Sequence, residues 1–456
     1  MVVIGAGITG LAAAHRIAMD QPDADLVVLE AGTRAGGRLT TSPVVGLPVD
    51  EGADAFLVRV PWASDLFAEV DLGEELVSPD GRLASLWLDG VLRPLPTPNV
   101  LGVPLDPSSV AQGILGSADL ERLAGSGQPN NTLPEGVGPD GDLTVGQVVR
   151  ACAGNAVFER LVDALLGGIN AGKADDLSCD VMAPQLLEAA RNPNGLLTTL
   201  RDVHREVDQN SPVFKTHPGG MGHLADRLAE TLGTALRVGC PVRSLTADGN
   251  GWTVHTDRDV ESADAVVLAT PVTTTAALLA GLCPPAATAL TAVEHASVTL
   301  VTFAYHRSDA PVPRNQSGFL VPRGEGMLMT ACSYVGSKWT HLDDGDHTLL
   351  RVSAGRIDDN RPEELDDDAL VDALATDLAT TRGVEAPPVA VRVSRWPQSL
   401  AQFRPGHRAR MADVAGQLDQ DAPGLVVAGA HHRGVGIPAC VHSGGEAAAA
   451  VAGRLV

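Results

Sequence analysis

The sequence predicts a mixed α/β (α+β) fold in which a parallel-sheet unit, a β-rich domain and a helical insert occur together. The apolar run Met1–Ile4 leads through a glycine turn into a helical pattern, and a second apolar run ends at Glu30, which is the order of a βαβ unit. A strand, a glycine turn and an alanine-rich helix follow again between Leu425 and Leu455. Because 456 residues exceed what one hydrophobic core usually serves, we expect two or three domains.

The chain between these ends predicts further elements in order. Residues 124–142 are rich in Gly, Pro, Asn and Asp, which favours a loop. Apolar residues then recur at helical spacing, and later runs alternate or are β-branched, as in strands. We expect helices within 143–166 and 181–207, strands at 236–238, 242–245, 252–255 and 265–269, and more strands with an acidic helix near 363–381 between 296 and 395.

Composition and charge exclude several classes of protein. With 44% hydrophobic and 20% charged residues the chain is globular rather than disordered. Its formal net charge of -23 would repel nucleic acid and anionic lipid surfaces. Lysine occurs only at positions 173, 215 and 338, so nearly every cation is a guanidinium, which suits the binding of an anionic small ligand.

Cysteine usage and hydropathy indicate where the protein works. The six cysteines form no CxxC pair and have no histidines at ligand spacing, so we expect neither a disulfide framework nor a metal site. No stretch reaches the roughly 18 uncharged apolar residues of a membrane span, and the start lacks the features of a signal peptide. We therefore expect a cytoplasmic protein with no integral membrane span.

A glycine motif opens the chain. The run Gly5, Ala6, Gly7, Ile8, Thr9 and Gly10 fits G-x-G-x-x-G directly after a strand and at the start of a helix, where backbone N–H groups can face a pyrophosphate. Glu30 lies 20 residues beyond Gly10, at the end of the second strand, where a carboxylate can accept ribose hydroxyls. The alternative is a glycine-rich turn without a ligand. The motif predicts a dinucleotide site but leaves NAD and FAD open.

Two further glycine clusters favour FAD. Gly36 and Gly37 lie between arginines just beyond the acidic residue, where backbone and guanidinium can approach a diphosphate. The segment Gly434–Pro438 precedes the last helix, whose N-terminus can stabilise negative charge on a reduced flavin. Two such helix starts at opposite chain ends suit one long dinucleotide.

Six motifs together resemble a known family across nearly the whole chain. They are Gly5–Gly10, Arg34–Thr41, Asp50–Phe56, Gly167–Gly172 with Leu177 and Ser178, Gly219–Met221, and Gly434–Cys440. On these residues the chain is similar to the FAD-dependent protoporphyrinogen/coproporphyrinogen oxidases within the flavin amine oxidase superfamily, and most to their soluble bacterial coproporphyrinogen III oxidase members.

The resemblance implies which residues would contact FAD. They come from the glycine motifs, from a turn near residue 53, from a middle strand and from the last loop. They are Gly5, Ala6, Gly7, Ile8, Thr9, Gly10, Glu30, Ala31, Gly36, Gly37, Arg38, Gly52, Ala53, Asp54, Ala55, Val242, Trp396, Val435, Gly436 and Ile437. For Trp396 the alternative is packing in a domain core.

Three residues are candidates for contact with the substrate. Arg59 resembles the family arginine that pairs with a substrate propionate, although a surface ion pair is the alternative. Gly168 would let the backbone lie against a flat ring, or would cap a helix together with Gly167. Lys338 is a further candidate anchor, with a solvated lysine as its alternative. For His431 and its neighbour His432 we expect a structural role, and we assign no catalytic acid or base.

The resemblance implies an oxidoreductase of heme biosynthesis that removes six electrons from coproporphyrinogen III in three hydride transfers to flavin. Its partners would be the porphyrinogen and dioxygen, with hydrogen peroxide as the second product. Protoporphyrinogen IX is the alternative substrate. A flavin amine oxidase or desaturase shares the Gly5 and Gly219 motifs, and a non-catalytic porphyrin carrier would use the same glycines.

The implied domain organisation interleaves three parts. A Rossmann-like FAD-binding domain would comprise residues 1–58, 208–290 and 395–456. A β-rich substrate domain would comprise 59–75 and 291–394, and a helical insert would comprise 76–207.

Overall fold

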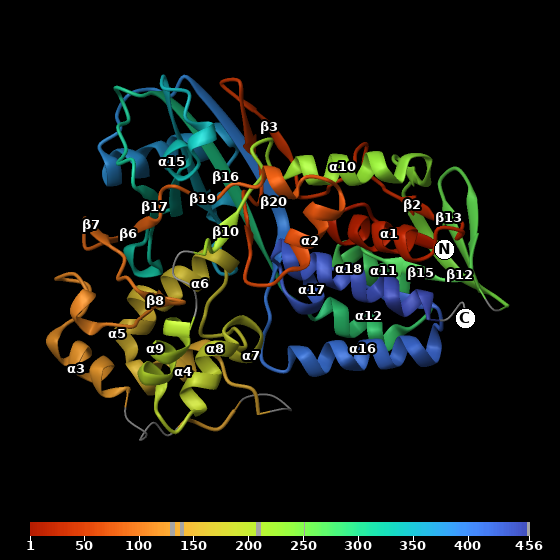
Figure 1. Ribbon diagram of the computed structural model, residues 1–456, viewed down its shortest axis with the longest axis horizontal. Coiled ribbons are helices and arrows are strands. Elements are labelled where there is room, and N and C mark those ends of the chain that lie inside the picture. The colour runs from red at the N-terminus through yellow and green to blue at the C-terminus, as the bar shows by residue number, and fades with distance from the viewer. Residues whose placement is uncertain (128–132, 137–140, 207–210, 250, 454–456) are drawn as a thin grey trace.

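Five short parallel strands from distant parts of the chain form one sheet, in the order β11-β2-β1-β15-β21. The structure is a computed structural model, and it describes residues 1–127, 133–136, 141–206, 211–249 and 251–453. The sheet confirms the predicted parallel unit and brings both chain ends into it (Figure 1). Its strands are β1 (Val2–Ile4), β2 (Val27–Leu29), β11 (Leu236–Arg237), β15 (Val266–Leu268) and β21 (Leu425–Val427).

Helices cover both faces of this sheet because its side chains alternate between two hydrophobic cores. Val3 and Val28 enter the first core, whereas Val2 and Ile4 enter the second. The first core is covered by α1 (Ile8–Asp20), α2 (Trp62–Glu69), α10 (Gly222–Leu232) and α18 (Ile437–Ala452). The second is covered by α11 (Val272–Leu279), α12 (Pro284–Thr291) and α16 (His407–Asp421).

An antiparallel meander flanks the second core, and two of its three strands contain the predicted strands 242–245 and 252–255. It packs through buried Trp252 and Val254. Its strands are β12 (Val242–Asp248), β13 (Gly251–Thr256) and β14 (Val260–Ala263).

A seven-stranded sheet forms the β-rich domain, in the order β20-β16-β19-β18-β17-β6-β7. All its neighbours are antiparallel except β17 and β6. The strands are β20 (Ala390–Ala401), β16 (His295–His306), β19 (His347–Ala354), β18 (Met329–Tyr334), β17 (Gln316–Leu320), β6 (Leu83–Leu88) and β7 (Val91–Pro94).

The predicted acidic helix is α15 (Asp367–Arg382), which packs on this sheet. Asp366 caps it by accepting from the Ala369 N–H at 2.9 Å, and Gly383 ends it at φ 67°. Leu370, Leu374 and Leu378 follow at a spacing of four, so one face of the helix enters the core of the sheet.

The remaining helices gather around a core of their own, below the seven-stranded sheet in Figure 1. Thr144 and Gln147 form a capping box at the start of α4. The helices are α3 (Ser117–Gly125), α4 (Val145–Ala153), α5 (Asn155–Val157), a π-turn over Phe158–Val162, α6 (Asp163–Asn170), α7 (Cys179–Met182), α8 (Pro184–Arg191) and α9 (Leu196–Glu206).

Two expected domain segments differ from the structure. Residues 59–75 were expected in the substrate domain, but α2 packs through Leu66 and Phe67 into the first core of the parallel sheet. The expected helical insert 76–207 contains β6 and β7, which pair with the seven-stranded sheet instead. Within the expected loop 124–142, residues 128–132 and 137–140 lie outside the described residues. Position 207, the end of the expected helical insert, lies outside them as well.

Short elements complete the chain. Among the residues that the structure describes, no helix has the length and apolar character needed to cross a membrane. The short strands are β3 (Thr41–Val44), β4 (Leu47–Asp50), β5 (Phe56–Leu57), β8 (Asn99–Val100), β9 (Val103–Pro104) and β10 (Phe214–Lys215). The short helices are α13 (Val335–Lys338), α14 (Arg361–Glu364), α17 (Ala430–Arg433) and 3-10 turns at Gly73–Glu75, Pro107–Ser109, Gly233–Ala235, Arg323–Glu325 and Thr340–Leu342.

Candidate functional site

The first glycine motif leaves open space in front of α1. A Cβ at Gly5 would lie 2.7 Å from the Ala269 carbonyl oxygen, and one at Gly10 would lie 1.9 Å from the Gly5 carbonyl oxygen, so both positions require glycine. A Cβ at Gly7 meets no atom within 4 Å, and Gly7 makes no side-chain cap for the helix. A helix start with no side-chain cap and with open space at Gly7 fits the diphosphate of the expected dinucleotide.

Glu30 lies at the end of β2 and holds this turn. Its carboxylate accepts from the N–H groups of Ala6 and Gly32, each at 2.7 Å. Its own backbone carbonyl accepts from Cys240 at 2.8 Å, which brings the start of β12 and Val242 to the same edge of the sheet. A carboxylate can accept about four hydrogen bonds, so Glu30 keeps capacity for ribose hydroxyls.

The second glycine cluster packs directly on the first. The Gly36 N–H donates to the Ala6 carbonyl at 2.8 Å, and a Cβ at Gly37 would lie 3.3 Å from the Cα of Gly7. Arg38 extends across to the end of β20, where it donates to the carbonyls of Ser399 at 2.8 Å and Gln398 at 3.1 Å. Arg38 therefore joins two parts of the expected cofactor site that are 360 residues apart.

The last glycine loop meets the first one. Helix α18 follows Gly434–Gly436 and lies beside α1, seen as blue beside red in Figure 1. A Cβ at Gly444 would lie 2.4 Å from the Thr9 carbonyl oxygen, so the two helices touch through this glycine. Gly436, like Gly7, makes no side-chain cap. The middle of α18 thus lies against the first turn of α1, so helices from opposite chain ends meet beside the first glycine motif.

The turn Gly52–Ala55 lies between Arg38 and Trp396. A Cβ at Gly52 would be 2.6 Å from the Arg38 carbonyl oxygen and 3.8 Å from the Trp396 ring. The Trp396 indole N–H donates to the Glu51 carbonyl at 2.8 Å. Trp396 is half-buried, so it is a neighbour of the expected cofactor turn rather than a residue of a distant core.

Asp54 is the only charged residue of the turn Gly52–Ala55, and three donor groups contact its carboxylate. Lys338 Nζ lies 2.8 Å and Trp339 Nε1 3.1 Å from its Oδ2, and Arg351 Nη2 lies 3.4 Å from its Oδ1. Burial alone would raise the pKa of Asp54, but Arg351 and Lys338 outweigh it and hold the pKa well below its usual range. Lys338, expected as a substrate anchor, is therefore already paired with a carboxylate inside the protein.

The pKa of the nearby Asp50 shifts in the opposite direction. Burial raises the pKa of Asp50 to about 6, although its carboxylate accepts from the Thr41 hydroxyl at 2.5 Å and the Met221 N–H at 2.8 Å. These contacts join the β3–β4 hairpin to the Gly219–Met221 motif at the start of α10.

Arg59 lies at the end of a short exposed ribbon. β5 pairs antiparallel with β10, and Leu57 stands opposite Phe214. These two apolar side chains are 43% and 40% exposed, and Arg59, two residues after Leu57, is exposed as well. β5 ends at Leu57 and Arg59 lies in the bend that follows, so the ribbon presents two exposed apolar groups with an exposed cation beyond its end.

Gly168 lies inside α6 rather than at its end. The helix C-cap is Ala171, in the left-handed region at φ 46°, so the alternative role of Gly167 and Gly168 as a cap is wrong. A Cβ at Gly168 would meet only Leu320 Cδ2, at 3.6 Å. The following Ile169 is 54% exposed, so this part of α6 offers an open, apolar surface.

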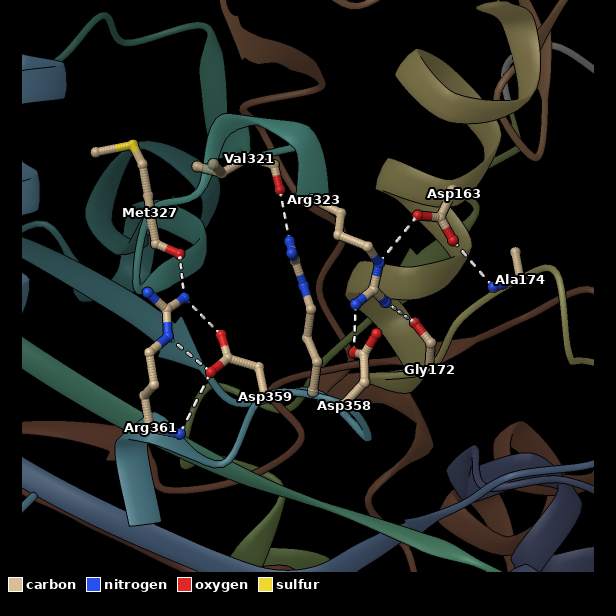
Figure 2. A network of polar contacts seen from close by, with 10 residues as sticks. Asp163, Gly172, Ala174, Val321, Arg323, Met327, Asp358, Asp359 and Arg361 are labelled. Carbon is tan, nitrogen blue, oxygen red and sulfur yellow. Dashed lines mark hydrogen bonds and ion pairs between the residues drawn. The ribbon is translucent and has the colours of Figure 1, made fainter. Parts of the chain in front are cut away.

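A polar network fixes α6 against the seven-stranded sheet, as Figure 2 shows. Arg323 donates to the Gly172 carbonyl at 2.7 Å and pairs with Asp163, at 3.5 Å, and with Asp358. Asp163 in turn accepts from the Ala174 N–H at 2.9 Å. The segment that contains Gly168 is thus held from both of its sides.

Sequence reasoning missed the arginines that hold the expected cofactor turn, namely Arg351 and Arg392. They lie 299 and 342 residues from Gly52 and Asp50 along the chain, and no local motif surrounds either one. The available signal was an arginine within an apolar strand pattern, because a charged side chain that is partly buried needs a partner.

Two buried histidines, His407 and His431, remain neutral at physiological pH. Burial, helped by the neighbouring His432, lowers the pKa of His431 to about 3, and burial lowers the pKa of His407 to about 4. In the described part of the chain, no three His, Cys, Asp or Glu side chains gather where they could hold a metal ion.

Comparison with known proteins gives one family and several full-length relatives. The family model described as flavin containing amine oxidoreductase matches residues 8–452. A coproporphyrinogen III oxidase of Mycobacterium leprae is 33% identical, covering 98% of this chain and 96% of the relative. One of Bacillus subtilis is 28% identical, covering 97% and 96%. The crystal structure of a putative protoporphyrinogen oxidase from Exiguobacterium superposes with a TM-score of 0.89, at 29% identity, over 99% of this chain and 98% of that one.

Proposed function

The chain belongs to the flavin-containing amine oxidoreductase family and is an FAD-dependent oxidoreductase, and within that family we propose that it oxidises coproporphyrinogen III to coproporphyrin III. The observation that supports coproporphyrinogen III as the substrate is the full-length similarity to relatives named coproporphyrinogen III oxidase. The overall reaction removes six hydrogens from the porphyrinogen, and three molecules of dioxygen take them up as three of hydrogen peroxide.

The residues proposed to hold FAD surround the two helix starts. The Gly5–Gly10 and Gly36–Gly37 turns would bind the diphosphate through backbone N–H groups, and Glu30 would accept from the ribose, with Ala31 and Val242 beside it. Gly52–Ala55, Trp396 and Val435–Ile437 would lie along the flavin. When bound, FAD accepts two electrons as hydride from a substrate C–H bond.

The substrate would bind through a cation and apolar surfaces. Arg59 would pair with a propionate, while Leu57 and Phe214 on the same face would pack against the apolar part of the tetrapyrrole. Gly168 and Ile169 on α6 would offer a second apolar surface. Lys338 is left out of this proposal because it already forms an ion pair with Asp54.

No general base is proposed for the reaction. Burial lowers the pKa values of His431 and His407 to about 3 and 4, so these two side chains neither release nor take up protons near neutrality. The pyrrole N–H groups of the substrate would release their protons to water instead.

The test is aerobic turnover of FAD-loaded protein with each of two porphyrinogens. Porphyrin fluorescence should appear in many equivalents per enzyme with coproporphyrinogen III, and peroxide should form at three per porphyrin. Faster turnover of protoporphyrinogen IX would show that the substrate is protoporphyrinogen IX and not coproporphyrinogen III. A porphyrin yield of one equivalent or less with both porphyrinogens would refute catalytic turnover and favour a porphyrin carrier. Oxidation of amines alone would refute porphyrinogens as the substrate class.

A further inference from the structure

Two arginines of the seven-stranded sheet stand in one cross-strand row. Arg351 on β19 and Arg392 on β20 are both opposite Thr302 of β16, the strand between them. Residues directly opposite one another in an antiparallel sheet project from the same face. The sheet therefore presents two guanidinium groups side by side to whatever lies against that face.

What lies against that face is the backbone that leads into the expected cofactor turn. Arg392 Nη1 donates to the Val49 carbonyl and Nη2 to the Asp50 carbonyl, each at 3.0 Å. Arg351 Nη1 donates to the Gly52 carbonyl at 3.2 Å. Three carbonyls of a four-residue stretch are thus bound by side chains of the other domain.

The carboxylate of Asp54 completes the contact. Its ion pairs with Lys338 and Arg351 are largely buried, with 19%, 12% and 22% of the Lys338, Arg351 and Asp54 side chains exposed. A buried ion pair costs desolvation, and removal of one partner leaves the other charge uncompensated. Three charged side chains that are far apart in the sequence therefore share one largely buried contact here.

We propose that Asp54, Lys338 and Arg351 form an inter-domain clamp that positions the turn Gly52–Ala55 against FAD. The seven-stranded sheet, and not the parallel sheet alone, then determines how tightly and in which orientation the flavin is held. Lys338 and Arg351 are positioning residues that act through the turn. The proposal rests on the assignment of this turn to FAD and is independent of which substrate is oxidised.

The test is FAD titration of apoprotein, followed by flavin fluorescence and by visible circular dichroism of the bound flavin. Arg351→Met should raise the Kd for FAD about 10-fold or more and change the dichroism, and Arg351→Lys should give a smaller increase. The matched control is Arg395→Met on β20, which removes contacts with Asp367, Pro362 and Leu365 but none with the turn. It should bind FAD as the wild type does.

A second variant guards against loss of folding. Lys338→Met leaves Asp54 paired with Arg351, so its apoprotein should unfold at a denaturant midpoint near that of the wild type while its Kd for FAD still rises. Wild-type Kd and dichroism in this variant would overturn the clamp, as would an equal loss of FAD binding in Arg395→Met. No porphyrinogen enters the titration, so failure of the substrate assignment would leave this result unaffected.

Discussion

Single residues divide into those that hold the protein together and those that remain free for a ligand. Lys338 and Arg59 show the difference, because both were expected at the substrate. Lys338 is paired with Asp54 at 2.8 Å, whereas Arg59 is exposed at the end of the β5–β10 ribbon. A cation keeps its capacity to bind an anionic ligand only when the fold has not already supplied a carboxylate.

Replacement of Arg59 should therefore weaken substrate binding without loss of FAD. Arg59→Met is expected to lower kcat/KM for coproporphyrinogen III about 10-fold or more, mainly through KM, because a charge-assisted pair contributes roughly 1.5–3 kcal/mol. Steady-state porphyrin fluorescence measures this. Arg408→Met removes an exposed arginine of α16 that pairs with Asp180 and serves as the control. Equal KM values in the two variants would exclude Arg59 from the substrate site.

At the scale of elements, the contact between α1 and α18 assembles the site. α18 approaches so closely at Gly444 that a Cβ there would meet the Thr9 carbonyl oxygen at 2.4 Å and the Ala13 nitrogen at 3.0 Å. The adjacent Gly445 has no atom within 4 Å of its Cβ position. One helix thus carries two neighbouring glycines, of which only one is required by packing.

This contrast predicts opposite effects of the same substitution. Gly444→Ala should destabilise the protein by about 1–3 kcal/mol, as overpacking does, and should raise the Kd for FAD because the two helix starts move apart. Gly445→Ala should stabilise by roughly 0.5–1 kcal/mol, because alanine loses less entropy in a helix. Denaturant unfolding and FAD titration measure both. Similar unfolding midpoints in the two variants would contradict the close helix contact.

At the scale of the whole molecule, the buried histidines make folding sensitive to acid. The pKa values of His431 and His407 in the folded state are about 3 and 4, below the ordinary 6.5. Between those limits the unfolded chain binds protons that the folded chain does not, so stability is full above pH 6.5 and falls as the pH decreases. Asp50, with its pKa raised to about 6, acts in the opposite direction below that pH.

The free energy of unfolding should therefore fall by about 2 kcal/mol or more between pH 7 and pH 5, since each buried histidine contributes up to ~1.4 kcal/mol per pH unit. His431→Gln should reduce the pH dependence of the free energy of unfolding by the contribution of one histidine. His306→Gln, which changes an exposed histidine, should leave it unchanged. Denaturant unfolding across the pH range provides the measurement, and an unchanged slope in His431→Gln would refute the assignment.

The sequence by itself determined the features that depend on neighbours along the chain. Gly5–Gly10, the buried strands beside it and the capped helix α15 follow from local spacing, because turns, caps and apolar periodicity are properties of adjacent residues. The parallel sheet was predicted on that basis, and the FAD-dependent family was predicted from the resemblance of six motifs to known proteins. The roles of the individual cofactor residues stay predictions.

Only the tertiary structure decided what each charged side chain binds and which core each element joins. Arg351 and Lys338 pair with Asp54, which is about 300 positions away in the sequence. α2 and β6 pack outside the domains in which their residues were expected. The physical reason is that burial of a charge depends on acceptors brought near by long-range packing, and no spacing along the chain encodes that proximity.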